Sequence, residues 1–140
     1  MWPVAHLLAA AVVVLATPAL AAQNYQDMDE ETLYRFIFDD VDIDHIILND
    51  RICDVYLRCF FNTGPCTNLA AAIRSKIPEV FETVCGKCTL KQKKIWKHAM
   101  DLFIPRRPKE WERLLSIYDP EGKFWPNIKV FRETPLPDGE

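Results

Sequence analysis

Apolar side chains recur every three or four positions through most of the chain after residue 31, and no segment sustains an alternation of apolar and polar residues. The first pattern is typical of amphipathic helices and the second would indicate strands, so we predict an all-α fold. A polar lead over residues 23–31 precedes the pattern. The pattern predicts about six short helices, which begin after Asp42, after Asn49-Asp50, at about Asn68, at Thr89, at Pro108 and around Asn127.

Several helix boundaries carry signals of their own. Thr89 and Gln92 have the spacing of a capping box, Pro105 is expected to end the helix that follows, and Pro108 suits the first turn of the next one. Pro78 lacks a backbone N–H, so we expect it to kink or split the helix over about 68–83. The buried stripe of the helix that starts at Thr89 is expected to comprise Ile95, Ala99, Leu102 and Phe103, flanked by Trp96 and Met100.

The first 22 residues differ in character from the rest of the chain. They contain no Asp, Glu, Lys or Arg, and their apolar run of about ten residues is too short to span a bilayer. Pro18 and the small residues Ala19 and Ala21 follow the run, as a signal peptidase requires. We therefore predict a secretory signal peptide at 1–22, cleaved after Ala21 or Ala22, and a secreted, extracellular protein without stable membrane insertion.

The remainder is expected to form one helical domain over residues 23–132. The tail over 133–140 contains two prolines and no apolar periodicity, so we expect it to be disordered.

Charge and residue types exclude several functions. The net charge of −3 offers no broad basic field for nucleic acid, and four glycines leave little for a phosphate-binding loop. Ser75 and Ser116 lack the Gly-x-Ser-x-Gly setting of hydrolases. His45 and His98 lack metal-ligand spacing and are expected to lie at the helix surface. The chain is thus predicted not to be an enzyme and to need no cofactor or metal, which leaves binding or structural roles.

Five cysteines follow the predicted signal, at positions 53, 59, 66, 85 and 88. Export favours disulfides, and two local loops follow most simply, although four cysteines allow three connectivities. The segment Cys85-Gly86-Lys87-Cys88 also resembles a thiol–disulfide exchange motif, and four cysteines could hold zinc. No strand precedes Cys85, and an oxidising compartment disfavours zinc, so both alternatives are minor. Cys53 is left over, either as a buried thiol or as a group for intermolecular pairing or redox chemistry.

The spacing Cys59-x6-Cys66-x18-Cys85-x2-Cys88 behind an export signal resembles that of the insect chemosensory proteins, the OS-D or pheromone-binding A10-like family. Further motifs follow in the same order, so the resemblance covers about residues 34–125. These motifs are the segment from Phe38 to Asp44, Asp50-Arg51, Tyr56-Leu57-Arg58-Cys59, Thr89-x-x-Gln92-Lys93, Pro108-x-x-Trp111 and Tyr118-Asp119-Pro120-x-Gly122-Lys123.

The resemblance implies a compact helical bundle around an apolar channel that binds long-chain lipids and semiochemicals in extracellular fluid. It also implies the pairs Cys59–Cys66 and Cys85–Cys88. Tyr56 and Gln92 would orient a ligand head, and Trp111 would form a large apolar wall. The residues that the resemblance places in the channel are Phe38, Asp39, Ile43, Ile46, Tyr56, Gln92, Ala99 and Trp111.

Two departures from the family pattern bear on the channel. Cys53 replaces an aliphatic residue, which fits a buried thiol, and Trp96 replaces a small residue and could narrow the channel or fill ligand volume. A helical stripe alone would favour an ordinary packed core, and only the resemblance favours a cavity. We predict a carrier or sequestrant of small apolar ligands, monomeric or dimeric through Cys53. The alternative is a secreted protein that acts in defence, development or regeneration through a protein partner.

Overall fold

The computed structural model describes residues 24–139, and within this range the chain is helical without any strand. The predicted all-α class is confirmed. The predicted signal peptide lies outside the described residues, within which no helix is both long and apolar enough to cross a membrane. In chain order, the elements are the 3-10 turn η1 (Tyr25–Asp27), α1 (Glu30–Tyr34), the π-helical turn η2 (Arg35–Asp39), α2 (Ile43–Leu48), α3 (Asp50–Phe60), α4 (Asn68–Thr83), α5 (Leu90–Arg106), α6 (Pro108–Tyr118) and α7 (Trp125–Glu133).

The seven α-helices of the described range exceed the expected six because α1 was not predicted. The side chain of Asp29 accepts a hydrogen bond from the Thr32 N–H at 2.9 Å, and Glu30 and Glu31 lie in the first turn, where acidic groups favour a helix start. Leu33 and Tyr34 are buried, as are Ile37 and Phe38 one turn later in η2. The segment thus joins the core directly, although its first turn is polar.

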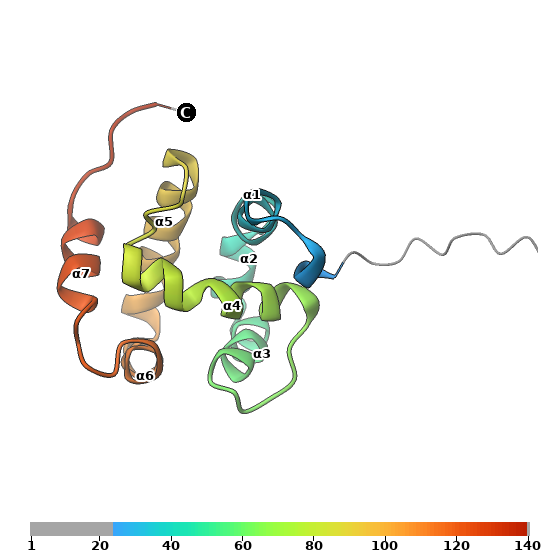
Figure 1. The fold of residues 1–140 in the computed structure, drawn as a ribbon. Coiled ribbons are helices and arrows are strands. Elements are labelled where there is room, and N and C mark those ends of the chain that lie inside the picture. Colours follow the sequence, from blue (N-terminus) through green and yellow to red (C-terminus); the bar gives the residue numbers. More distant parts are fainter. Residues whose placement is uncertain (1–23, 140) are drawn as a thin grey trace, which may run out of the picture.

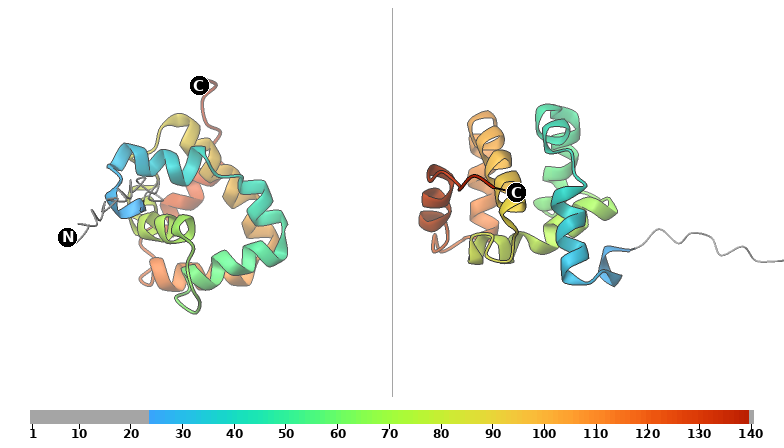
Figure 2. Two further views of the ribbon diagram at one scale, coloured as in Figure 1. Left: turned by 90° about the vertical axis from the view of Figure 1, so that its right-hand side faces the viewer. Right: turned by 90° about the horizontal axis from the view of Figure 1, so that it is seen from above.

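The helices are arranged on two sides of α5 and α6. Figure 1 and the view from above in Figure 2 both place α7 on one side of α5 and α1, α2 and α3 on the other. Helix α4 runs across the molecule and contacts both α3 and α6 (Figure 1). Buried residues therefore lie on both sides of the α5–α6 pair, toward the first three helices and α4 on one side and toward α7, which contains the fully buried Ile128, on the other.

Two helices continue through a proline. Helix α4 is not split at Pro78, whereas the kink expected as the other outcome stays a prediction. Helix α5 extends past Pro105 to Arg106, so the expected end at Pro105 is wrong by one residue. Pro78 leaves one carbonyl without its helical donor, but Val80 and Phe81 are buried directly after it, and this packing keeps the helix whole. Pro108 occupies the first turn of α6 as predicted.

The buried face of α5 is rotated from the predicted one. Gln92, Trp96, Met100 and Phe103 are buried, whereas Ile95, Ala99 and Leu102 are only half-buried. The predicted capping box is present: the Thr89 N–H donates to Gln92 Oε1 at 3.0 Å, and the Gln92 N–H donates to Thr89 Oγ1 at 3.2 Å. The polar residue Gln92 therefore belongs to the buried face of α5. A search for a stripe of apolar residues does not find it.

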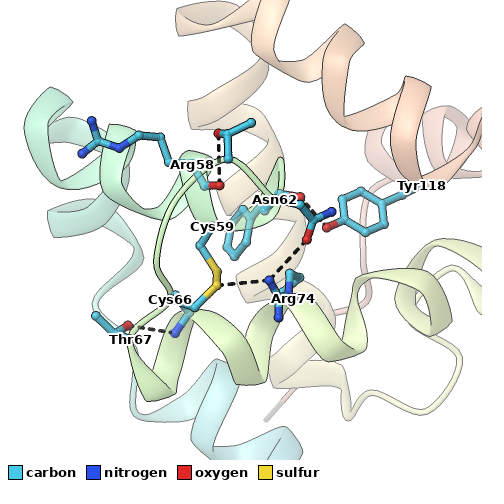
Figure 3. Close-up of a disulfide and its surroundings, with 10 residues drawn as sticks. Arg58, Cys59, Asn62, Cys66, Thr67, Arg74 and Tyr118 are labelled. Atoms are coloured by element: carbon cyan, nitrogen blue, oxygen red, sulfur yellow. Dashed lines mark hydrogen bonds between the residues drawn. A yellow bond between two sulfur atoms is a disulfide. The ribbon is translucent and has the colours of Figure 1, made fainter.

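Two disulfides join sequence neighbours, Cys59 with Cys66 and Cys85 with Cys88, as the family resemblance implied. The first connects the end of α3 to the turn before α4. Figure 3 shows Arg74 of α4 beside it, with Nη1 donating to Asn62 Oδ1 and Cys66 Sγ, each at 3.2 Å. The disulfide thus fixes this loop to α3, and the charged side chain of Arg74 fixes it to α4.

The second disulfide closes the turn between α4 and α5. Val84 and Cys85, at the start of this turn, have left-handed backbone conformations with φ of 52° and 55°. Residues other than glycine rarely adopt this conformation. Cys85 is fully buried, so the turn is held by packing as well as by the disulfide.

The chain after α7 returns toward the start of α5, where Lys94 Nζ donates to the Gly139 carbonyl at 2.6 Å. Glu133 is the last residue of α7. The expected disorder over 133–140 stays a prediction.

Candidate ligand-binding cavity

The interior between η2 and helices α2 to α6 contains a cavity of about 180 Å³. No residue of α7 lines it. The lining is almost wholly aliphatic and aromatic, and Lys76 is its one charged residue. A space of this chemistry can accept an apolar ligand, because an apolar void of similar size binds small hydrocarbons.

Most of the sequence-predicted ligand residues come together around this cavity. The half-exposed ones belong to α2, α3 and the middle of α5, and the buried ones belong to η2, α5 and α6. The predicted residues that line the cavity are Phe38, Ile43, Ile46, Tyr56, Trp96, Ala99 and Trp111.

Asp39 and Gln92 do not line the cavity. The Gln92 side chain is 3% exposed and holds the start of α5 through its capping box, so it already has a structural role. Asp39 is half-buried at the end of η2, and its Oδ1 is shielded without a hydrogen-bond partner.

Trp96 lies between the cavity and α7. Its ring is 5.1 Å from that of Phe131 in α7 and 6.4 Å from that of Phe81 in α4. It therefore occupies volume on the wall of the cavity while it anchors α7 on the opposite side.

A polar cluster lies at the edge of the cavity beside Lys76. The Lys76 ammonium lies 3.3 Å from Glu79 Oε2 and 5.6 Å from the centre of the Tyr34 ring. Glu79 also accepts hydrogen bonds from Lys87 at 2.8 Å and from the Tyr34 hydroxyl at 2.6 Å. These donors, Lys87 first, lower the pKa of Glu79 from 4.5 to about 2. The cluster ties α1 to α4 and leaves Lys76 already paired.

Two other lining side chains carry polar atoms. The Tyr56 hydroxyl makes no hydrogen bond with the described residues, and burial raises its pKa, so it is a neutral group. Trp111 is 7% exposed, and its Nε1 is shielded without an acceptor.

Cys53 is the free cysteine, and it is 3% exposed on the cavity wall. Burial raises the pKa of its thiol, and the nearby Arg107 guanidinium only partly opposes this shift. The thiol is therefore protonated and unreactive near neutral pH, as expected of a structural buried cysteine.

A surface groove adjoins the cavity, since Ile43 and Ile95 line both. Charged side chains of α2 and α5 border it, and His98 Nε2 lies 2.7 Å from Asp44 Oδ1. His98 thus makes a helix-surface contact, as predicted. Among the described residues, no group of three or more His, Cys, Asp or Glu could hold a metal ion.

Sequence reasoning missed further parts of the lining. Leu57, Phe81, Met100, Phe103 and Leu114 all reach the cavity. Met100 and Phe103 lie on or beside the apolar stripe predicted for α5, but periodicity identifies the buried face of a helix and not the part of that face that borders a void.

The model of the insect pheromone-binding family, A10/OS-D, matches residues 34–126. The chain belongs to this family. The match extends from the end of α1 to the start of α7 and thus includes every element that lines the cavity.

Relatives from two insects support this membership. The chain is 38% identical to the putative odorant-binding protein A10 of Drosophila melanogaster over 111 residues, which are 76% of this chain and 69% of that protein. It is 30% identical to ejaculatory bulb-specific protein 3 of the same species over 124 residues, or 89% and 90% of the two chains. It is 28% identical to allergen Tha p 1 of Thaumetopoea pityocampa over 92 residues, or 66% and 73%.

Proposed function

We propose that this protein is a secreted, soluble, non-catalytic carrier or sequestrant of small apolar ligands. The observation that carries the proposal is the apolar cavity of about 180 Å³ inside a member of a pheromone-binding family. One relative is named a putative odorant-binding protein, which supports the same role.

The cavity volume limits what can enter without rearrangement. An apolar cavity of about 150 Å³ holds benzene, so the space here suits a ligand of that size or slightly larger. Longer chains require the walls to move or the ligand to protrude. Ile46, Tyr56 and Ile77 line the cavity and are half-exposed, so they are the side chains best placed to move.

A longer chain for which the walls do move would bind with moderate affinity. A dozen buried methylenes would contribute up to about 10 kcal/mol at roughly 0.8 kcal/mol each, and association costs at least about 4 kcal/mol. The difference of about 6 kcal/mol corresponds to a dissociation constant in the tens of micromolar. Binding of this strength is reversible, as carriage requires.

Titration of the purified, disulfide-bonded protein with a fluorescent apolar probe tests the proposal. We expect saturable binding that long-chain alcohols, acids and esters displace. Ala99→Phe should fill the cavity and weaken binding at least about tenfold, whereas Trp96→Ala should extend binding to larger ligands. Val130→Phe on the exposed face of α7 is the matched control and should change nothing. Absence of saturable binding in the unmodified protein would refute the carrier function.

Export is tested separately. When insect cells express the full chain, the protein should appear in the medium with its N-terminus at Ala22 or Gln23. Retention of an uncleaved chain in the cell would contradict secretion.

The alternative of a protein partner has less support. Among the described residues, the exposed large apolar side chains are Leu48 in α2 and Val130 in α7, which do not form one patch. Cys53 is buried, so a dimer through this thiol would require local opening. We therefore propose a monomer, which gel filtration with and without reductant would test.

A further inference from the structure

The surface groove between α2 and α5 shares part of its lining with the apolar cavity. Ile43 of α2 and Ile95 of α5 border both spaces, and both side chains are half-buried. Along α5, Lys91 lies one turn before Ile95 and lines the groove, whereas Ala99 lies one turn after it and lines the cavity. A ligand that follows this face of α5 would therefore pass from charged to apolar surroundings at Ile95.

The charged side chains of the groove are not equally engaged. Asp44 Oδ1 lies 2.7 Å from His98 Nε2, and the Asp42 carboxylate caps the start of α2. The Lys94 ammonium donates to a backbone carbonyl of the C-terminal tail, and the Lys91 ammonium has no partner among the described residues. Both acids are thus in use, and the two ammonium groups lack an anionic partner within the described chain.

A long amphipathic ligand would use both spaces. The cavity of about 180 Å³ holds a chain of about a dozen carbons only if its walls move or the ligand protrudes. An ionised head has a high cost in an apolar interior, so the head is the end that protrudes. A head that leaves the cavity beside Ile95 lies within about 6 Å of Lys91 and Lys94 along the axis of α5.

We propose, on the basis of the carrier function above, that the groove between α2 and α5 holds the anionic head of an amphipathic ligand whose chain lies in the cavity. Lys91 and Lys94 contact the head, and the chain passes between the half-buried side chains of Ile43 and Ile95. The protein then favours an acid over the alcohol of the same chain length, because a hydroxyl gains no charge-assisted hydrogen bond from the two ammonium groups.

The test compares dodecanoic acid with dodecanol as competitors of the fluorescent probe at about pH 8, where the acid is ionised. The quantity measured is the affinity for the acid divided by the affinity for the alcohol. Replacement of both groove lysines, by Lys91→Gln with Lys94→Gln, should lower this ratio about three- to tenfold. Lys93→Gln with Lys97→Gln is the matched control, because both lysines belong to α5 and line neither space. This control should change the ratio less than about twofold.

Three results would overturn the proposal and leave the carrier function intact. The acid could fail to displace the probe that the alcohol displaces, the ratio could be unchanged by replacement of the groove lysines, or the control could lower it equally. The last result would indicate a general effect of charge rather than a site. Absence of saturable probe binding in the unmodified protein would overturn both the groove site and the carrier function.

A second measurement locates the head in the unmodified protein. Ammonium groups beside the head lower the pKa of its carboxyl below that of the free acid, whereas burial inside the cavity raises this pKa. Carbon-13 nuclear magnetic resonance of bound dodecanoic acid, labelled at the carboxyl carbon, follows the titration. A raised pKa would place the head inside the cavity and contradict the groove site.

Discussion

The α5–α6 pair is apolar on both sides, but its neighbours fill only one of them. On the α7 side, Ile128 is fully buried, and the rings of Trp125 and Phe131 pack on Trp111 and Trp96 at 5.5 and 5.1 Å. On the opposite side, where α2, α3 and α4 lie, a cavity of about 180 Å³ remains. Large rings close the first side, whereas the second, lined by isoleucines and Ala99 as well as by aromatic rings, is not filled.

Polar ties at its edges add to the apolar packing of the hollow side. The Tyr118 hydroxyl donates to the Phe60 carbonyl at 2.6 Å, Arg107 Nη1 donates to Asp54 Oδ1 at 2.6 Å, and Tyr34 donates to Glu79 at 2.6 Å. Figure 3 shows the first of these beside the Cys59–Cys66 disulfide. A void forfeits dispersion contacts, so polar and covalent ties at the helix ends keep the walls in place without filling the space. The comparison indicates that packing stabilises one side and leaves the other free for a ligand.

The largest effect is expected when one isoleucine on each side is replaced by alanine and the two losses of stability are compared. Ile128→Ala opens a new void in a filled region and should destabilise the protein by about 2–5 kcal/mol. Ile47→Ala, at a buried residue that already borders the cavity, should cost less, because part of its surface has no neighbour to lose. Urea unfolding measures both, and equal losses would contradict the distinction between the two sides.

Removal of a disulfide should have the next largest effect. Cys59→Ala with Cys66→Ala opens a loop of sequence separation 7 and should destabilise by about 2.5 kcal/mol. The pair at Cys85 and Cys88, with separation 3, should contribute about 2 kcal/mol. The midpoint of denaturant unfolding measures the stability of both variants. If the disulfides shape the cavity, the affinity for the fluorescent probe should fall as well. Unchanged affinity in both variants would show that the cavity walls do not need the disulfides.

Acid should weaken the polar cluster beside Lys76. The pKa of Glu79 is about 2 in the folded protein and 4.5 as a free group, so its contribution to stability is complete above pH 4.5 and disappears as the pH falls through about 2. Glu79→Gln should therefore lose less stability than the unmodified protein between about pH 6 and about pH 2.5. Urea unfolding of both proteins at both pH values tests this. If the two proteins lose the same stability on acidification, the Glu79 cluster is not the acid-sensitive interaction.

The smallest effect is expected at the surface pair of Asp44 and His98. Their side chains are 59% and 54% exposed, so solvent screens the interaction. Asp44→Asn should change stability by less than about 0.5 kcal/mol by thermal unfolding. A larger loss would place this pair among the ties that hold α2 to α5.

Local signals predicted most of the fold. The capping box at Thr89, proline in the first turn of α6 and the cysteine spacing are recognisable without tertiary information, and the structure confirms each. Helix α1 was missed because its start signals, the capping Asp29 and two glutamates, also fit an unstructured polar lead. Its helical character becomes clear only with the buried residues that follow, from Leu33 to Phe38.

The site was less predictable than the fold. Residue-by-residue comparison with the family pattern placed Tyr56 and Trp111 in the channel and marked Trp96 as a departure that could narrow it, and all three line the cavity. Gln92 was assigned to the ligand, yet the structure uses its amide to cap α5. Periodicity cannot separate a packed core from a cavity wall, because both require apolar residues at the same spacing and differ only in the size of the opposing side chains.

The most direct test of the hollow side follows isoleucine methyl groups by carbon-13 nuclear magnetic resonance during titration with an apolar ligand. Our account predicts saturable shifts for the methyls of Ile46, Ile47 and Ile77, which line the cavity, and little change for Ile128 on the filled side. Shifts that never saturate, or that affect Ile128 as strongly as the cavity methyls, would contradict it.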